Sequence, residues 1–200
     1  MIRVETWKRF GQMLDTRLAK PVFTTEDSLR YTFFAALLEC ENLKPEDIIL
    51  EHRHPTISSA QIDTWIPTIN GSGVAMEFKY DRHIPSGSNA NRTQKAGKIF
   101  HDLYRLGQFE KTARRIFVYL SSSEMTNYFS SEKNGLSKFF SLAQGAALRI
   151  DDAFIAARAK SFTSMVPTAP NIEVVSLWTQ GLPQNHLIRA YEVREFGRRQ

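Results

Sequence analysis

The sequence has little of what secreted or membrane-bound proteins rely on. It contains one cysteine, Cys40, in 200 residues, so a disulfide framework is excluded and a reducing, cytoplasmic setting is expected. The first residues, MIRVETWKRFGQML, carry four charges and lack the continuous apolar run of a secretion signal. No stretch reaches the length of a membrane span. We therefore expect a soluble intracellular protein with no membrane partner.

The sequence also lacks internal repeats, low-complexity segments and long linkers, and its charge is unevenly placed. Hydrophobic residues make up 42% of the chain, which is enough for one domain over residues 1–200 to bury a core. The net charge is +5, and the whole excess lies between Met76 and Arg115, with nine Lys or Arg against four Asp or Glu. This local excess predicts a polyanionic partner such as DNA. A solvated face that keeps the protein soluble is the alternative.

Hydrophobic periodicity predicts helices and strands in alternation. One helix is expected over residues 4–18, and a second from Thr24 or Thr25, both good N-cap residues, to the region before Pro45. Three strands are expected at residues 47–53, 60–69 and 73–82. The NGSG turn joins the last two strands into a hairpin. A helix over 93–107 precedes a buried strand over 114–122, an order that implies a parallel neighbour for this strand.

After Ser121 the periodicity weakens. One or two helices are predicted within residues 123–160, followed by strands at 172–179 and 186–195. Helix, β-meander, helix, strand and a mixed tail together predict an α/β fold, in which helices flank a mixed β-sheet.

Three acids and a lysine stand out on these elements. Asp63 lies in the middle of an apolar strand, where Asp is disfavoured. Glu77 and Lys79 alternate with apolar residues on the strand after the NGSG turn. Glu26 precedes the apolar stripe of its helix at helical spacing, so it is expected to face the sheet. The four residues are therefore candidates for one site.

The three segments TTEDSLR, QIDTWI and AMEFKYD resemble the motifs of the PD-(D/E)xK nucleases, the restriction-endonuclease-like superfamily. A helix-borne Glu, a strand Asp and a Glu-x-Lys pair appear in the order that this superfamily uses. Ile62 stands where the proline of the family name would be. The resemblance covers residues 20–121 and implies a restriction-endonuclease-like core there, which leaves residues 122–200 for recognition or dimerisation.

The resemblance also implies a cofactor and roles for individual residues. Mg²⁺, for which Mn²⁺ can substitute, would be held by Asp63, Glu77, the main-chain carbonyl of Phe78 and, directly or through water, Glu26. Mg²⁺ prefers such oxygen ligands and keeps several waters. Lys79 would orient or deprotonate the attacking water.

The helix after Glu-x-Lys completes the expected site. In many members of the superfamily a polar residue near its start faces the metal, and Gln94 is the first candidate here. The residues expected to contact the DNA backbone are Arg82, Arg92, Lys95 and Lys98. Together these features predict a metal-dependent endonuclease that acts on DNA in restriction, phage defence or repair. A homodimer with two active sites is the common way in which this superfamily cuts two strands.

Three other readings stay open. The chain can be a nucleic-acid-binding module that keeps the nuclease fold without cutting. It can also be a structural or protein-interaction domain whose charges are incidental. His52 and His54 have the spacing of a zinc-binding pair on one strand face, but no cysteine or further histidine completes that site, which favours a polar strand end.

A shared metal places a condition on the hairpin. Directly opposed residues of an antiparallel pair share a face, and their numbers sum to a constant. A two-residue turn at 70–71 gives an odd sum, which puts Asp63 and Glu77 on opposite faces. A longer odd loop, or a bulge, restores an even sum. We predict that Asp63, Glu77 and Lys79 share a face and that the apolar residues alternating with them pack into the core.

Overall fold

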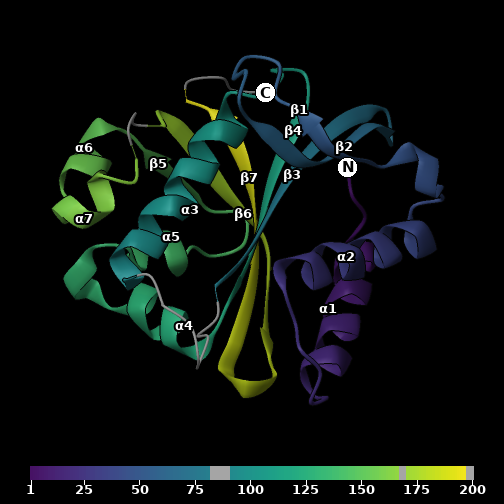
Figure 1. The fold of residues 1–200 in the computed structure, drawn as a ribbon, viewed down its shortest axis with the longest axis horizontal. Helices are drawn as coiled ribbons and strands as arrows, with labels where there is room; N and C mark the ends of the chain where they lie inside the picture. Colours follow the sequence, from purple (N-terminus) through teal and green to yellow (C-terminus); the bar gives the residue numbers. More distant parts are fainter. Residues whose placement is uncertain (82–90, 167–169, 197–200) are drawn as a thin grey trace.

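A seven-stranded mixed β-sheet forms the centre of the molecule, with helices on both faces (Figure 1). The computed structural model describes residues 1–81, 91–166 and 170–196. The strands are β1 (Ile49–Arg53), β2 (Gln61–Ile69), β3 (Ser72–Asp81), β4 (Arg114–Ser121), β5 (Ala147–Ile150), β6 (Ile172–Leu182) and β7 (His186–Glu195). Their order in the sheet is β1-β2-β3-β4-β7-β6-β5. The predicted α/β class, with helices flanking a mixed sheet, is confirmed.

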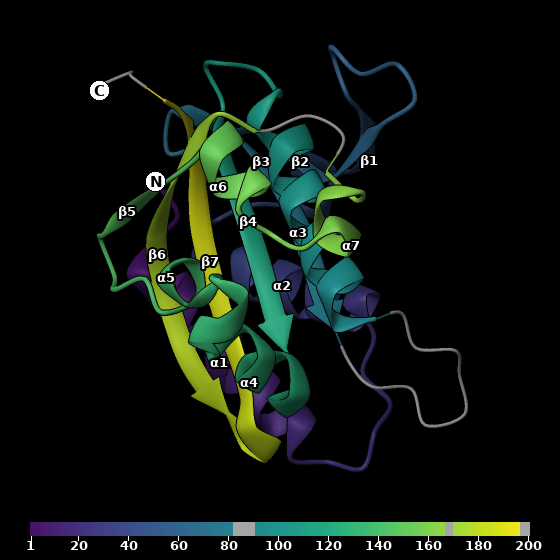
Figure 2. The same ribbon diagram turned by 90° about the vertical axis from the view of Figure 1, so that its left-hand side faces the viewer.

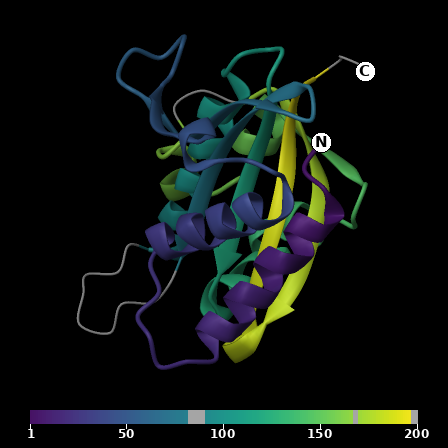
Figure 3. The same ribbon diagram turned by 90° about the vertical axis from the view of Figure 1, so that its right-hand side faces the viewer.

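Two helices cover one face of the sheet, α1 (Val4–Leu18) and α2 (Glu26–Cys40) (Figure 3). α2 begins after Thr25, whose hydroxyl accepts a hydrogen bond from the Ser28 amide while the Ser28 hydroxyl accepts one from the Thr25 amide. This capping box fixes the start of the helix and makes Glu26 its first residue. Leu29 and Phe33 are fully buried beneath α2, in the same core cluster as Phe78 of β3.

The other face is covered by the remaining helices (Figure 2). These are α3 (Arg92–Gly107), α4 (Ser123–Ser130), α5 (Ser137–Phe140), α6 (Asp152–Ala156) and α7 (Lys160–Thr163). The 3-10 turns are η1 (Pro45–Asp47), η2 (Glu132–Asn134) and η3 (Pro183–Asn185). α3 packs closely on α7 because Gly97 has no side chain: a Cβ there would lie 2.7 Å from the Phe162 carbonyl.

β3, α3 and β4 form the crossover that the sequence predicted. β4 pairs with β3 in parallel, from Val74 opposite Arg114 to Asp81 opposite Ser121. The other neighbouring strands of the described sheet are antiparallel. Parallel pairing requires the chain to return over the sheet between the strands, and α3 makes that return. The end of β3 at Asp81 therefore lies near the first turns of α3, and Glu77 lies near its last turn.

The C-terminal region holds more elements than predicted. Residues 123–160 were expected to form one or two helices, but they form α4, α5, α6 and the edge strand β5. β5 has four residues with a mixed burial pattern, too few for a period to be read from the sequence. β6 continues to Leu182, three residues beyond its predicted end.

The β2–β3 hairpin combines a two-residue turn with a bulge. Asn70 and Gly71 have φ values of +49° and +82°, and Ile69 lies opposite Ser72. The register then shifts before Ile66, which lies opposite Val74. The bulge contains Pro67, which has no N–H to give to the ladder. The residue numbers of directly opposed residues sum to 141 at the turn and to 140 beyond the bulge. The bulge therefore gives the even sum that a shared face requires, which is one of the two routes that the sequence allowed.

None of the helices in the described parts of the chain is long and apolar enough to cross a membrane.

Candidate functional site

The pairing of β2 with β3 ends before β3 does. Beyond the last pair, acidic side chains accept hydrogen bonds from the β3 amides that have no partner in β2. The last pair is Thr64 opposite Met76. Beyond it, the Phe78 N–H donates to Asp63 Oδ2 at 2.7 Å. The Tyr80 N–H donates to Glu26 Oε2 at 3.1 Å. β2 and α2 thereby position two of the predicted acids along the open edge of β3.

Asp63 and Glu77 lie on the same face of the sheet, as predicted. Trp65 lies opposite Ala75, and Asp63 and Glu77 each lie two residues further along their strands. Burial raises the pKa of Glu77 well above its usual range, and repulsion from Asp63 adds to this rise. Burial also raises the pKa of Asp63, while hydrogen bonds from the Phe78 amide and the Glu77 side chain act against the rise. The two carboxyl groups are therefore near neighbours.

Lys79 lies next to the helix-borne acid, Glu26. Its Nζ is 3.1 Å from Glu26 Oε2. Burial alone would lower the pKa of Lys79, but the neighbouring carboxylates of Glu26 and Asp102 outweigh burial and raise it. Lys79 is therefore an ammonium ion at neutral pH. This state suits orientation of a water molecule or stabilisation of negative charge rather than removal of a proton.

α3 contributes two residues that sequence reasoning did not assign to the site. Arg105 Nη2 lies 2.7 Å from Glu77 Oε1 and 3.6 Å from Asp102 Oδ1. Burial raises the pKa of Asp102 to about 6, although Lys79 and Arg105 act to lower it. Lys98, Asp102 and Arg105 recur at spacings of four and three. This polar stripe was the signal in the sequence that could have identified them.

A second guanidinium approaches Asp63 from α2. Arg30 Nη1 lies 3.8 Å from Asp63 Oδ1, and the same side chain contacts Glu51 and Asp27. Because Arg30 divides its charge among three carboxylates, it compensates Asp63 only in part. Arg30 thus fixes the position of Asp63 without neutralising the site.

The other predicted residues lie around this centre rather than in it. Gln94 is half-buried in the first turn of α3, and no hydrogen bond or ion pair joins it to the acids within the described residues. Its neighbour Lys95 lies near enough to lower the pKa of Asp81, against the larger effect of burial. Lys98 is exposed. Arg92 is exposed and pairs with Glu124 at 3.7 Å. Arg82 lies outside the described residues.

The histidines expected as an alternative site have other contacts. His54 Nε2 lies 2.8 Å from the Arg105 carbonyl, which can only accept, so this nitrogen donates. Nδ1 then accepts hydrogen bonds from the amides of Thr56 and Ile57. The ring of His52 stacks on Trp65. Both histidines thus secure the start of the β1–β2 connection.

The donor set at the open edge of β3 fits a small divalent cation. In a strand the N–H and C=O of one residue point to the same side, so the Phe78 carbonyl faces Asp63 as its amide does. Four carboxylates share the site with three cationic side chains. Burial is the main cause of the raised pKa values of Asp63, Glu77 and Asp102, and repulsion from neighbouring carboxylates adds to it. In the parts of the chain that are described, no three His, Cys, Asp or Glu side chains form a complete metal cage. An ion would therefore depend on the carbonyl and on water as well as on two acids.

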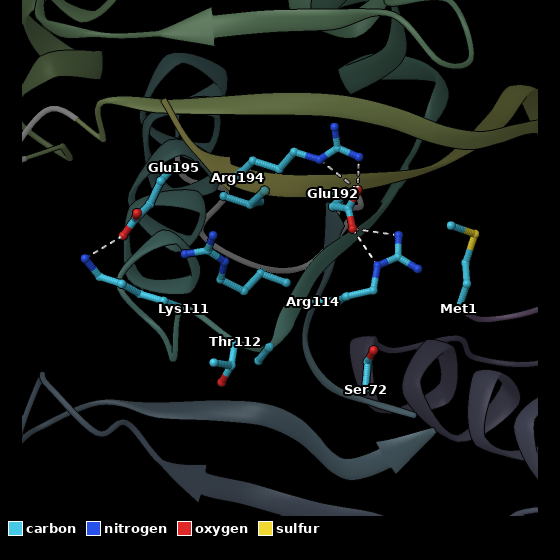
Figure 4. A pocket seen from close by; sticks show the side chains of 11 residues that line it. Met1, Ser72, Lys111, Thr112, Arg114, Glu192, Arg194 and Glu195 are labelled. Atoms are coloured by element: carbon cyan, nitrogen blue, oxygen red, sulfur yellow. Dashed lines mark hydrogen bonds and ion pairs between the residues drawn. The ribbon is translucent and has the colours of Figure 1, made fainter. Parts of the chain in front are cut away.

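A second charged cluster surrounds a cavity of about 390 Å³ at the opposite end of β4 (Figure 4). Glu192 lies between two guanidiniums: its Oε1 is 2.6 Å from Arg114 and its Oε2 is 2.5 Å from Arg194. Burial raises the pKa of Glu192, but the bonds from Arg114 and Arg194 outweigh burial and lower it. Lys111 pairs with Glu195 at 3.2 Å. Arg114 and Lys111, part of the basic excess noted in the sequence, thus serve ion pairs between strand ends.

Comparison of the chain with protein-family models, with curated proteins and with solved structures finds no match, so the meaning of the acid cluster rests on its own geometry.

Proposed function

We propose that this chain is a divalent-metal-dependent nuclease of the PD-(D/E)xK type that hydrolyses phosphodiester bonds in DNA. One observation carries the proposal: Asp63, Glu77, Lys79 and Glu26 converge on the open edge of β3. They come from three elements and lie as far apart as 53 positions in the sequence. Chance placement of buried carboxylates is disfavoured, because each burial without full compensation costs free energy.

The surrounding fold supports the same proposal. α2, the β1–β2–β3 meander, α3 and the parallel strand β4 follow in the order that a restriction-endonuclease-like core requires. The remaining elements, from α4 to β7, extend the sheet on its far side. They are free to serve in recognition or in a homodimer that would bring two active sites to two strands.

Asp63, Glu77 and the Phe78 carbonyl would hold Mg²⁺ or Mn²⁺, with Glu26 close by. When bound, the ion would neutralise charge on the phosphate and lower the pKa of a bound water. Lys79, as an ammonium, donates hydrogen bonds that orient the attacking water and offset the charge that builds on the phosphate. Glu26 fixes the position of Lys79 through their 3.1 Å ion pair.

DNA is the substrate that the surrounding charge favours. Lys95, near the start of α3, lies close to Asp81 at the end of β3, and Arg92 and Lys98 on the same turns are exposed, so these side chains can contact backbone phosphates.

A nucleic-acid-binding module that does not cut is the second candidate. It is favoured by the two guanidiniums in the site, because Arg105 and Arg30 already face Glu77 and Asp63. If these cations replace a metal permanently, the fold would bind DNA without hydrolysing it. The nuclease requires instead that Arg105 yields part of its contact with Glu77 to the ion.

Incubation with plasmid and with single-stranded DNA separates the candidates. The nuclease predicts cleavage with Mg²⁺ or Mn²⁺ and none with EDTA. The binding module predicts retention of DNA that weakens steeply with salt and no cleavage under any condition. A structural or protein-interaction domain should show no cleavage and no salt-sensitive binding of DNA. That result would refute the proposed function.

A further inference from the structure

A cavity of about 380 Å³ lies beside the acid cluster, where the loop between α1 and α2 meets the ends of β3, β4 and the β6–β7 turn. The side chains that decide its chemistry are Lys20, Phe23, Tyr80, Ser122, Gln184 and His186. Its volume is within the range of small-ligand sites, about 300–1,000 Å³. Segments far apart in the sequence thus build one concave surface.

The acids of the cluster do not line the cavity, but the backbone of Tyr80 joins the two. Tyr80 lines the cavity with its side chain, while its amide donates to Glu26. Thr24, on the other wall, precedes Glu26 by two residues. A group held in the cavity would therefore lie next to a phosphate held at Lys79 and Glu26.

Three aromatic rings from separate elements face this region. Phe23 is 68% exposed, and the rings of Tyr80 and His186 have centroids 5.8 Å apart. The loop that carries Phe23 is held in place because Arg17 donates both to the Phe23 carbonyl, at 2.9 Å, and to the Ser28 hydroxyl, at 3.0 Å. A fixed, exposed aromatic ring is a stacking platform for a nucleobase.

The polar groups of the cavity are mainly neutral. His186 Nδ1 lies 3.0 Å from the Pro183 carbonyl, which can only accept, so Nδ1 donates; Nε2 lies 3.0 Å from the Tyr80 hydroxyl. The Ser122 hydroxyl is buried and has no hydrogen-bond partner among the described residues. Gln184 uses its amide nitrogen to bond the Leu18 carbonyl, which leaves its own carbonyl oxygen for a ligand.

We propose that this cavity receives an unpaired nucleobase from the DNA strand that is cut, an inference that rests on the proposed nuclease function. Aromatic faces with a few neutral donors and acceptors match a base, whereas a phosphate would call for several cations and the described lining contains Lys20 alone. A base within a duplex reaches such a pocket only after unstacking, which costs free energy. The preferred substrates are therefore single strands, overhangs or gaps.

Binding of labelled oligonucleotides tests the cavity apart from cleavage. Full-length protein carrying Glu77→Gln is titrated in Mg²⁺ with a single strand and with a blunt duplex of the same sequence. We expect tighter binding of the single strand. Phe23→Ala should weaken that binding by about tenfold or more, since stacking on one aromatic ring has effects of this size. Duplex binding should stay unchanged.

Tyr31→Ala is the matched control, because Tyr31 is also an exposed aromatic residue, at 56%, but lies on α2 outside the cavity. Equal effects of Phe23→Ala and Tyr31→Ala on single-strand binding, or no effect of either, would overturn the proposal. Cleavage by the otherwise unchanged chain is measured separately. If Phe23→Ala alone loses single-strand binding, the proposed role of the cavity is supported even if no cleavage is seen. If the chain cleaves DNA but Phe23→Ala binds the single strand normally, the nuclease proposal holds and the proposed role of the cavity is refuted.

Discussion

Two buried glutamates in this molecule face arginines and yet behave in opposite ways. Glu77 and Glu192 are 3% and 4% exposed, and each lies within 2.7 Å of a guanidinium nitrogen. The pKa of Glu77 is raised and that of Glu192 is lowered. Burial raises the pKa of both and acts more strongly on Glu77, which lies deeper in the protein, and the neighbours of the two groups add to this difference.

The neighbours differ in number and sign. Glu192 has one guanidinium at each oxygen and no acid beside it among the groups that shift its pKa. Glu77 has one guanidinium, while Asp63 and Asp102 repel it. The ion pairs of Glu192 thus place one cation at each carboxylate oxygen. A cluster left short of positive charge is the kind of arrangement found at functional sites, and a divalent cation would supply what it lacks.

The largest expected effect is on activity. Asp63→Asn, Glu77→Gln and Lys79→Ala should each lower the rate of DNA cleavage by about 10²-fold or more, because electrostatic groups of this kind have effects of that size. Their losses should be non-additive, since the residues act as one unit. Single-turnover cleavage of plasmid measures the rates.

Glu192→Gln is the control for this series, because it removes a buried carboxylate from the other cluster. Its cleavage rate should match that of the unchanged chain at a temperature where it is folded. Full activity in Glu77→Gln, or a double variant that loses the product of the single effects, would contradict the shared role.

The next effect is on stability, and here the variant of the Glu192 cluster should show the larger loss. Glu192→Gln should lower the free energy of unfolding by about 3–5 kcal/mol, because it leaves two guanidiniums facing each other without a carboxylate. Glu77→Gln should raise it, because the charge is removed while the amide oxygen still accepts from Arg105. Urea unfolding at pH 7 in EDTA measures both. Destabilisation of similar size in the two variants would contradict the difference proposed between the Glu77 and Glu192 clusters.

A smaller effect concerns Asp102 and pH. Its pKa is about 6 in the folded protein against 3.8 ordinarily, so the folded state binds this proton more tightly. The contribution to stability is present below pH 4 and is lost as pH rises through 6. Asp102→Asn keeps the group uncharged and should be more stable than the unchanged chain at pH 7 by on the order of 1–3 kcal/mol.

That gain should disappear when unfolding is measured near pH 4. Asp15→Asn, at an exposed position of α1, is the matched control and should show no such dependence. A gain for Asp102→Asn that is the same at both pH values would mean that burial of the charge is not its source.

The sequence predicted the acids on the strands better than the residues on α3. Asp63, Glu77 and Lys79 could be found because an acid in an apolar strand breaks a period of two. Whether they share a face could not be settled, since parity depends on a bulge. That bulge forms where Pro67 lacks a donor and where the Trp65 ring covers Gly73, a position at which a Cβ would lie 2.3 Å from the ring.

Asp102 and Arg105 were missed for a different reason. Helical spacing indicates which residues share a face, but the crossover decides which point of the sheet that face meets. Gln94 was chosen for its place at the start of α3, whereas the contacts with the acids come from residues two to three turns further on. The short elements after Ser121 were likewise beyond prediction, because β5 and α5 have four residues each.

The most direct test of the account is thermal unfolding with and without metal. The central claim is that the acid cluster at β3 binds a divalent cation, so millimolar Mg²⁺ or Mn²⁺ should raise the Tm of the unchanged chain relative to EDTA. At a concentration 100 times the Kd the stabilisation would be about 2.7 kcal/mol. The same rise should occur in Glu192→Gln and be lost in Asp63→Asn and Glu77→Gln. No rise in the unchanged chain, or an equal rise in all four proteins, would contradict the claim.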